Sequence, residues 1–190
     1  MLFPLAFMCH VCTLQKRYRK QKLTYTGGTG TPAIGQTVTG GTSHQTAEIT
    51  RVGTGYIVVK TVSGAFTTGE TITTTTLSGN LSVQADYLNQ SNEYEYYWLD
   101  DQVDVPCRFG YSGRDSESAM IHETGQLLDQ PVKVALPDTI TLTGTQGEWA
   151  GNYRVVSTVD GFTGTFQIMT PYVVNGISSI DHYSFILKGV

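Results

Sequence analysis

An internal repeat constrains the fold of this chain more than any other feature of its sequence. The segment GQTVTGGTSHQTAEI begins at Gly35, and the segment GETITTTTLSGNLSV begins at Gly69. An ungapped register of 34 residues relates the two copies and aligns Ile49 with Val83. Apolar residues alternate with Thr beside a polar tip, which is the pattern of a β-hairpin. Because one hairpin is marginal in water, the two copies are expected to close a small β-barrel or sandwich.

The repeat defines a module that we place at residues 26–86. Of the 28 Thr in the chain, 18 lie between Thr24 and Thr76, where they favour strands over helices. Between the two copies lies the Val- and Ile-rich segment GYIVVKTVSGAF, which predicts a further strand. The flanking segments TGGTGTP and DYLNQSNEYE have the composition of linkers.

The remaining residues, 1–25 and 87–190, are predicted to form a β-barrel body into which the module is inserted. Runs typical of strands occur at VKVALP (132–137), TITLTG (139–144) and GNYRVVSTVDG (151–161), and then at TFQIMTPYVV and HYSFILKGV. The predicted fold class is therefore all-β, with a small β-barrel body and an inserted small β-barrel or sandwich module.

An earlier strand of this body is predicted around the segment DQVDVPCRFGYS. Period-two alternation is expected to place Val103, Val105 and Cys107 on one face of that strand. Pro106 cannot donate a backbone hydrogen bond, so it limits the strand to a sheet edge or to a strand end.

Charge is unevenly distributed along the chain. Five of the twelve basic residues lie between positions 16 and 22, whereas the residues after Lys22 carry seven basic and all sixteen acidic side chains. This pattern predicts a basic arm before an acidic body, and an acidic body does not bind DNA nonspecifically. The arm is either a solvated strand face or an interface toward acidic protein or phosphates. Its residues are Lys16, Arg17, Arg19, Lys20 and Lys22.

An aromatic and acidic run, EYEYYWLD, follows the module. In a strand, about half of its rings must point away from the core. Exposed Tyr and Trp side chains are typical anchors of protein interfaces, and a sugar platform is the alternative interpretation. The candidate interface residues are Tyr94, Tyr96, Tyr97 and Trp98.

No residue pattern in the sequence reaches the level of a catalytic or metal site. Cys9 and Cys12 form a CxxC pair, but no second pair follows at the spacing of a zinc site. Cys107 lacks a nucleophile signature, and FGYSGRD lacks the spacing of a phosphate-binding loop. We therefore expect no enzyme activity, no cofactor and no metal, and interpret Cys107 as a core residue.

Targeting signals are equally weak. The apolar start MLFPLAFM is too short to span a bilayer, and its basic run follows the apolar residues instead of preceding them as in a signal peptide. Three cysteines, an odd and small number, argue against a secreted disulfide framework. We expect a chain that is made in the cytoplasm and has no membrane segment.

Outside residues 26–86 the chain resembles the head-closure proteins of tailed viruses, which are also called head-completion, stopper or head–tail joining proteins. The resemblance lies in the order of several short motifs and covers about two-thirds of the chain. In order, these are CTLQ from Cys12, Trp98 and Asp101 before VPCR at Val105–Arg108, SGR from Ser112, Gly125-Gln126, VKVALP from Val132, YRVV from Tyr153, and the closing strand HYSFILKGV.

The resemblance implies a structural protein that forms a ring in the virion neck, of twelve copies or alternatively six. Such a ring extends the DNA channel, retains the packaged double-stranded DNA and docks the tail. The implied partners are further copies of the chain, the portal or adaptor protein, and tail terminator or tail tube proteins. The alternative function is a tail, baseplate or capsid decoration module that binds host glycan.

Within this hypothesis, the polar loop after the VPCR motif is the candidate for the channel or adaptor-facing surface. The candidate residues are Arg108, Ser112, Gly113, Arg114, Asp115 and Glu117.

Overall fold

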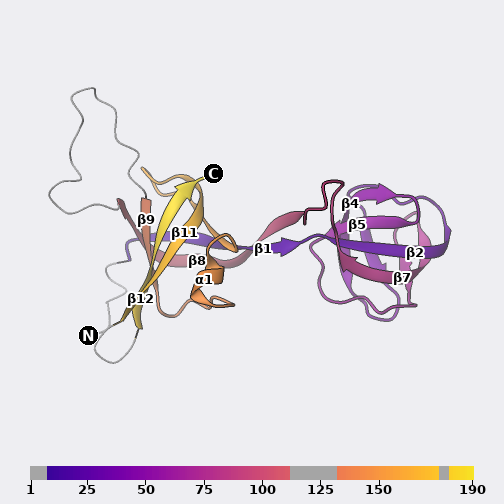
Figure 1. Cartoon of the computed structure of the whole chain (residues 1–190), viewed down its shortest axis with the longest axis horizontal. Helices are drawn as coiled ribbons and strands as arrows, with labels where there is room; N and C mark the ends of the chain where they lie inside the picture. The colour runs from indigo at the N-terminus through magenta and orange to yellow at the C-terminus, as the bar shows by residue number, and fades with distance from the viewer. Residues whose placement is uncertain (1–7, 112–131, 176–179) are drawn as a thin grey trace, which may run out of the picture. The chain divides into compact units, whose positions relative to one another are not determined.

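The structure is a computed structural model that describes residues 8–111, 132–175 and 180–190. The chain divides into two compact units, of which unit 2 comprises Tyr18–Leu99. Unit 1 comprises the residues up to Arg17 together with Asp100–Val190. Each unit contains a closed barrel of six strands (Figure 1). The prediction of an all-β chain with a β-barrel body and an inserted β module is confirmed.

Unit 2 is longer at both ends than the predicted module of residues 26–86. Its first strand begins at Gln21 and ends at Thr29, so most of the predicted linker TGGTGTP lies in a strand or directly beside one. The linker interpretation is therefore wrong for Thr26–Thr29. Gly27 has a φ of 63°, which a Gly adopts without strain and which accompanies a shift in the register of this strand.

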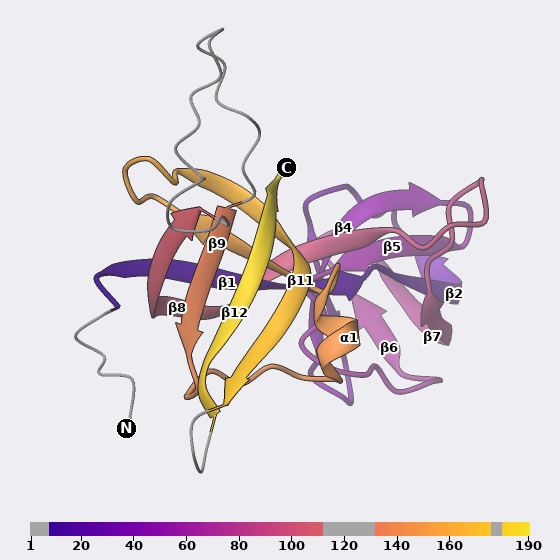
Figure 2. The same cartoon turned by 60° about the vertical axis from the view of Figure 1, so that its left-hand side comes forward.

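The unit 1 barrel has the strand order β1-β10-β11-β12-β9-β8. Figure 2 shows β9, β12 and β11 side by side. Antiparallel ladders join β1 to β10, β10 to β11, β11 to β12, β12 to β9 and β9 to β8. A single turn of helix, α1, contacts β11. The elements are β1 (His10–Arg19), β8 (Tyr96–Tyr111), β9 (Val132–Pro137), α1 (Gln146–Trp149), β10 (Tyr153–Ser157), β11 (Gly164–Asn175) and β12 (Ile180–Gly189).

Aromatic rings fill much of the unit 1 core. Trp149 of α1 packs edge-on against Tyr183, with 5.3 Å between ring centroids, and Phe109 stacks on Phe162 at 5.2 Å. Tyr153 and Phe185 are completely buried. Burying one such side chain stabilises the fold by roughly 1.5–3 kcal/mol, so these rings contribute much of the stability of the barrel.

Two local predictions for unit 1 are wrong. TITLTG at 139–144 forms no strand, because the Tyr153 hydroxyl accepts a hydrogen bond from the backbone N–H of Thr143 at 3.0 Å, which holds this segment in an irregular course. Val103 is 61% exposed, whereas Val105 and Cys107 are buried. The intervening Asp104 has a φ of 53°, in the left-handed region, and this interrupts the alternation of side chains along β8.

The unit 2 barrel has the strand order β2-β5-β4-β3-β6-β7, and every neighbouring pair in that order is antiparallel. Its core is mostly aliphatic, with the fully buried Leu23, Ile49 and Ile72 among its members. The strands are β2 (Gln21–Thr29), β3 (Thr37–Gly40), β4 (Thr46–Gly53), β5 (Tyr56–Lys60), β6 (Thr71–Thr73) and β7 (Ser78–Asp86).

The internal repeat corresponds to the hairpins β3–β4 and β6–β7, but its ungapped register is wrong beyond the polar tip. Thr37 pairs with Glu48 in the first hairpin, and Thr71 pairs with Asn80 in the second. The first strands are thus offset by 34 residues and the return strands by 32, because the second tip is two residues shorter. Accordingly Leu81, and not Val83, takes the buried position equivalent to Ile49.

Within the part of the chain that the structure describes, no helix is long and apolar enough to cross a membrane.

Candidate functional site

The residues of the predicted basic arm lie in β1 and β2, with Lys20 between the two strands. Lys16 and Arg17 lie in unit 1, and Arg19, Lys20 and Lys22 lie in unit 2. In unit 1, Lys16 Nζ donates to Thr143 Oγ1 at 2.6 Å, and Arg17 Nη2 donates to Asn152 Oδ1 at 3.0 Å. The interpretation of these five residues as one continuous arm is therefore wrong, because the boundary between the two compact units falls after Arg17.

In unit 2, the basic residues meet the predicted aromatic run. The Arg19 guanidinium lies 4.1 Å from the centre of the Tyr94 ring and forms a 2.6 Å salt bridge with Asp86. Arg19 also shares a side-chain hydrogen bond with Tyr96. Leu88 forms an isolated β-bridge with Tyr94. We name these five exposed or half-buried residues the Arg19–Tyr94 surface.

The charges of the Arg19–Tyr94 surface are balanced within it. Hydrogen bonds from Arg19 and then from Gln21 hold the pKa of Asp86 below its usual range. The Asp86 carboxylate accepts from Arg19 through Oδ2 and from Gln21 Nε2 through Oδ1, both at 2.6 Å. The exposed fractions of Leu88 (41%), Tyr94 (43%) and Tyr96 (38%) leave a mixed apolar and polar surface with no large net charge. Such a surface suits contact with protein better than capture of an anion.

A second ion group lies beside this surface and fixes the segment that carries it. Lys20 Nζ and Arg51 Nη2 contact the two oxygens of Glu95 at 2.9 Å and 3.2 Å. The Arg51 Nη1 also donates to the Tyr87 hydroxyl at 2.8 Å. The backbone N–H of Lys20 donates to the carbonyl of Glu95 at 2.8 Å. These bonds tie residues 87–95 to β4 and to the junction of β1 and β2.

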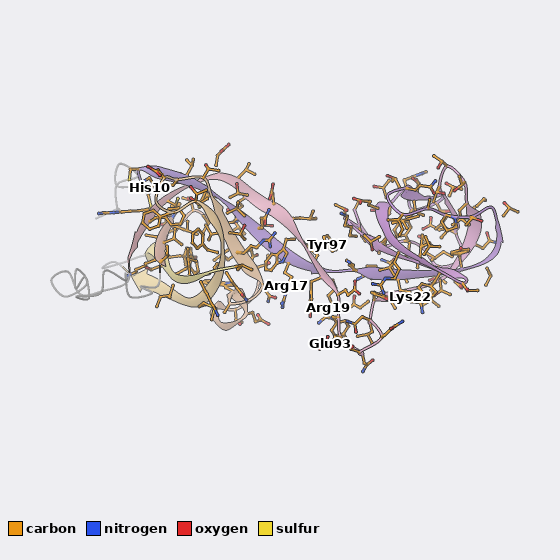
Figure 3. The ribbon with its side chains drawn as sticks, turned by 90° about the horizontal axis from the view of Figure 1, so that it is seen from above. His10, Arg17, Arg19, Lys22, Glu93 and Tyr97 are labelled. Carbon is orange, nitrogen blue, oxygen red and sulfur yellow. The ribbon has the colours of Figure 1, made fainter. Side chains whose placement is uncertain are left out.

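The remaining predicted aromatic residues are less accessible. Tyr97, which is labelled in Figure 3, stacks on Tyr18 with 5.8 Å between ring centroids. Trp98 is half-buried. Burial raises the pKa of Tyr97 above its usual value, although hydrogen bonds with the backbone of Val62 and Thr61 oppose the shift. Lys22 covers the Tyr56 ring with its Nζ 4.4 Å from the ring centre. Tyr94 and Tyr96 are thus the more exposed pair of the aromatic run.

The candidate channel loop is mostly outside the described residues. Arg108 lies on β8 opposite Ala135 of β9, and its side chain is exposed. Ser112, Gly113, Arg114, Asp115 and Glu117 lie outside the residues that the structure describes.

The cysteines are placed as core and surface residues. Cys107 is completely buried and Cys12 is 4% exposed, and both belong to the unit 1 core. This confirms the interpretation of Cys107 as a core side chain. Cys9 is exposed. Among the residues that the structure describes, no three His, Cys, Asp or Glu side chains are grouped as metal ligands.

Sequence reasoning missed a pair of polar side chains that organise the repeat. Gln36 and Glu70 each follow a Gly of positive φ and precede the first strand of a hairpin. The backbone N–H of Ala33 donates to Gln36 Oε1, and that of Thr67 donates to Glu70 Oε1, at 3.1 Å and 2.7 Å. The signal was present in the sequence as the matching GQTVT and GETIT segments.

Glu70 is the more deeply buried of this pair, with 5% of its surface exposed. Its Oε2 accepts from the backbone N–H groups of Thr42 and Ser43 at 2.9 Å and 2.8 Å, and its Oε1 accepts from Ser43 Oγ at 2.7 Å. Burial alone would raise the pKa of Glu70, but the hydrogen bonds from Ser43, Thr42 and Thr67 hold it below its usual range. The carboxylate therefore fastens the first hairpin tip to the start of the second hairpin.

No family model, no curated protein and no solved structure matches this chain.

Proposed function

We propose that this chain is a structural protein of a tailed virus that forms a ring in the virion neck, between the portal or adaptor and the tail. One observation carries the proposal. The segments CTLQ, VPCR, VKVALP and YRVV, on which the resemblance to head-closure proteins rests, lie in β1, β8, β9 and β10 of one closed barrel. The residues between the first two of these segments form a separate compact unit, as expected for an insertion into such a barrel.

The charge distribution supports a role beside DNA without tight binding to it. Unit 1 contains seven Lys and Arg against eleven Asp and Glu. Each phosphate contact made by Lys or Arg adds salt-dependent affinity, so an acidic barrel lets packaged DNA pass and leave. The ring would have twelve copies, or six, and Arg108 and the loop after it would face the channel or the adaptor. In this proposal the protein performs no catalysis.

The proposal is tested by removing the chain from assembling particles. Without it, heads should fill with DNA but fail to retain it, and heads and tails should accumulate unattached. Supplying the wild-type chain in trans should restore attachment, which controls for effects on neighbouring genes. Full, infectious particles assembled in the absence of the chain would overturn the proposal. The measurement is a count of filled, empty and tailed heads by electron microscopy.

A second candidate function, binding of a neutral glycan by unit 2, is favoured by one feature. A surface groove of about 430 Å³ is lined by Thr, Ser and Gly residues and by Leu77, with no charged side chain. Hydroxyl groups without charge suit a neutral, hydroxyl-rich ligand. The lining residues are Thr29, Gly30, Thr73, Thr74, Thr75, Thr76, Leu77 and Ser78.

Several hydroxyl groups of the groove are already engaged in hydrogen bonds within the unit. Thr74 and Thr76 donate to Gln36 Oε1 at 3.0 Å and 3.1 Å, and Thr75 accepts from Gln36 Nε2 at 2.7 Å. This favours the neck function over the glycan function. Binding of the purified chain to an array of neutral glycans, abolished by Thr29→Trp in the groove, would reverse the order of the two candidates.

A further inference from the structure

Two buried thiols lie on neighbouring strands of the unit 1 barrel. Cys12 lies on β1 and Cys107 lies on β8, and these strands are neighbours in the closed barrel. Both side chains are buried and belong to the same core cluster. Neither thiol contributes to the proposed neck function.

The contacts between β1 and β8 explain why these two residues meet. The Nδ1 atom of His10, which is labelled in Figure 3, accepts a hydrogen bond from the backbone N–H of Phe109. Further along the two strands, Gln15 Nε2 donates to Asp100 Oδ1. Residue numbers therefore rise along β1 as they fall along β8, so the strands are antiparallel. Advancing two residues from the His10–Phe109 contact along both strands reaches Cys12 and Cys107, on the same face of each strand.

We propose that Cys12 and Cys107 form an intramolecular disulfide bond when the chain meets a thiol oxidant such as oxidised glutathione. Directly opposed residues of antiparallel strands have Cα atoms about 4.5–5.5 Å apart, which lies within the range that a disulfide bridges. Because both side chains already lie in one core cluster on neighbouring strands, the bond requires little movement of either strand.

The reaction is an exchange of thiols for disulfides. The sulfur of one cysteine loses its proton and attacks oxidised glutathione, which releases one glutathione and leaves a mixed disulfide. The second cysteine then loses its proton and displaces the other glutathione, so two protein thiols become one disulfide and two glutathione thiols form. The neighbouring Cys107 thiol, burial, and the negative charge that Cys107 would carry all raise the pKa of Cys12. The exchange is therefore expected to occur during local opening or folding of the barrel, when a thiolate can form.

The bond would connect the two strands through which the chain leaves unit 1 and returns to it. All of unit 2 lies between the two cysteines in sequence, so β1 and β8 close a long loop without a covalent connection. Closing a loop of this length costs conformational entropy, and a disulfide removes part of that cost from the folding of unit 1.

The test uses the full chain with Cys9→Ser, which leaves Cys12 and Cys107 as its two cysteines. The protein is unfolded in urea and refolded in a buffer of reduced and oxidised glutathione. Free thiols are then alkylated, and tryptic peptides are analysed by mass spectrometry without reduction. We expect a linked species joining peptides 1–16 and 61–108, with loss of most of the alkylatable thiol and a raised urea midpoint for unit 1. Without unfolding, the linked species should form many times more slowly.

Two controls distinguish a native disulfide from a nonspecific cross-link and from a misfolded chain. Cys9→Ser combined with Cys107→Ser should give no linked peptide and no rise in the midpoint. Near-ultraviolet circular dichroism before and after oxidation should agree, because the barrel packing is retained. Recovery of Cys12 and Cys107 as free thiols or as separate glutathione adducts in a refolded chain would overturn the proposal, as would a linked chain with lost near-ultraviolet signal.

Discussion

The two units have the same architecture but different kinds of core. Among the described residues, five of the fifteen in the main core cluster of unit 1 are aromatic, whereas one of the nine in the main core cluster of unit 2 is aromatic. Unit 2 instead buries the carboxylate of Glu70 at a hairpin junction, and the buried polar side chains of the described part of unit 1 are the uncharged Ser157 and Ser184. A six-stranded barrel can therefore be closed by large rings or by short repeated hairpins whose turns are fastened by polar side chains.

This difference predicts that the two barrels fail under different perturbations. Unit 1 should respond most to loss of apolar volume, and unit 2 to loss of hydrogen bonds and to acid. The chain has one Trp in each unit, Trp149 in unit 1 and Trp98 in unit 2. Trp98→Phe leaves Trp149 as a fluorescent reporter of unit 1, and Trp149→Phe leaves Trp98 as a reporter of unit 2.

The largest effect is expected from Phe185→Ala in unit 1. Phe185 is completely buried and packs near Trp149, with 6.3 Å between ring centroids. Removing the ring should lower the free energy of unfolding of unit 1 by about 3–5 kcal/mol through lost burial and a residual cavity. Urea unfolding followed by Trp149 fluorescence measures this change. If Phe185→Ala lowered the urea midpoint of unit 2 by the same amount, the two units would not unfold independently.

Glu70→Ala should have the next largest effect, and it should be confined to unit 2. The substitution leaves the backbone N–H groups of Thr42, Ser43 and Thr67 without their acceptor. Loss of hydrogen bonds to a charged group, together with buried unsatisfied donors, should cost about 2–4 kcal/mol. Gln36→Ala is the matched control in the first copy of the repeat, and it should cost about 1 kcal/mol because Gln36 is less buried. Equal losses for the two variants would contradict the special role of the buried carboxylate.

Acid should weaken unit 2 before unit 1. The folded-state pKa values of Glu70 and Asp86 lie below their usual values, because both carboxylates accept several hydrogen bonds. The stabilisation is therefore complete above the unfolded-state pKa, at about pH 4, and is lost as the pH falls through the lower folded-state values. Urea midpoints measured from neutral pH downward should fall more for the Trp98 reporter than for the Trp149 reporter. Glu70→Gln should reduce that difference, and an unchanged difference would assign the acid response to other groups.

The smallest effect on stability is expected from Arg19→Ala. The salt bridge to Asp86 is exposed, and exposed ion pairs contribute little because solvent and salt screen them. The urea midpoint of unit 2 should stay within experimental error. Arg19 and Tyr94 are instead expected to matter for binding, so Arg19→Ala and Tyr94→Ala should both impair assembly of particles. Normal assembly of particles with both variants would show that the Arg19–Tyr94 surface is not an interface needed for assembly.

Much of the fold was predictable from the sequence, since alternation directly reports which face of a strand is buried. VKVALP, for example, occupies β9 with the predicted bounds. The errors have local causes that alternation does not reveal. Asp104 at positive φ turns Val103 outward, and a hairpin tip shorter by two residues shifts the equivalent of Ile49 to Leu81.

The candidate site was only partly predictable, because it depends on contacts between distant segments. Composition identified the basic and aromatic runs, but the pairing of Arg19 with Asp86 and Tyr94 required the barrel topology. Likewise, the sequence showed Gln36 and Glu70 at equivalent positions of the repeat, but it did not show that their side chains bond to the backbone of the turns.

Electron microscopy of purified particles is the first test of the proposed place of this chain in the virion neck. A neck protein should give a closed ring of density around the DNA channel, between portal and tail, into which two six-stranded barrels per copy can be fitted. Density for this chain at the tail tip or on the capsid surface, with none in the neck, would overturn the proposal.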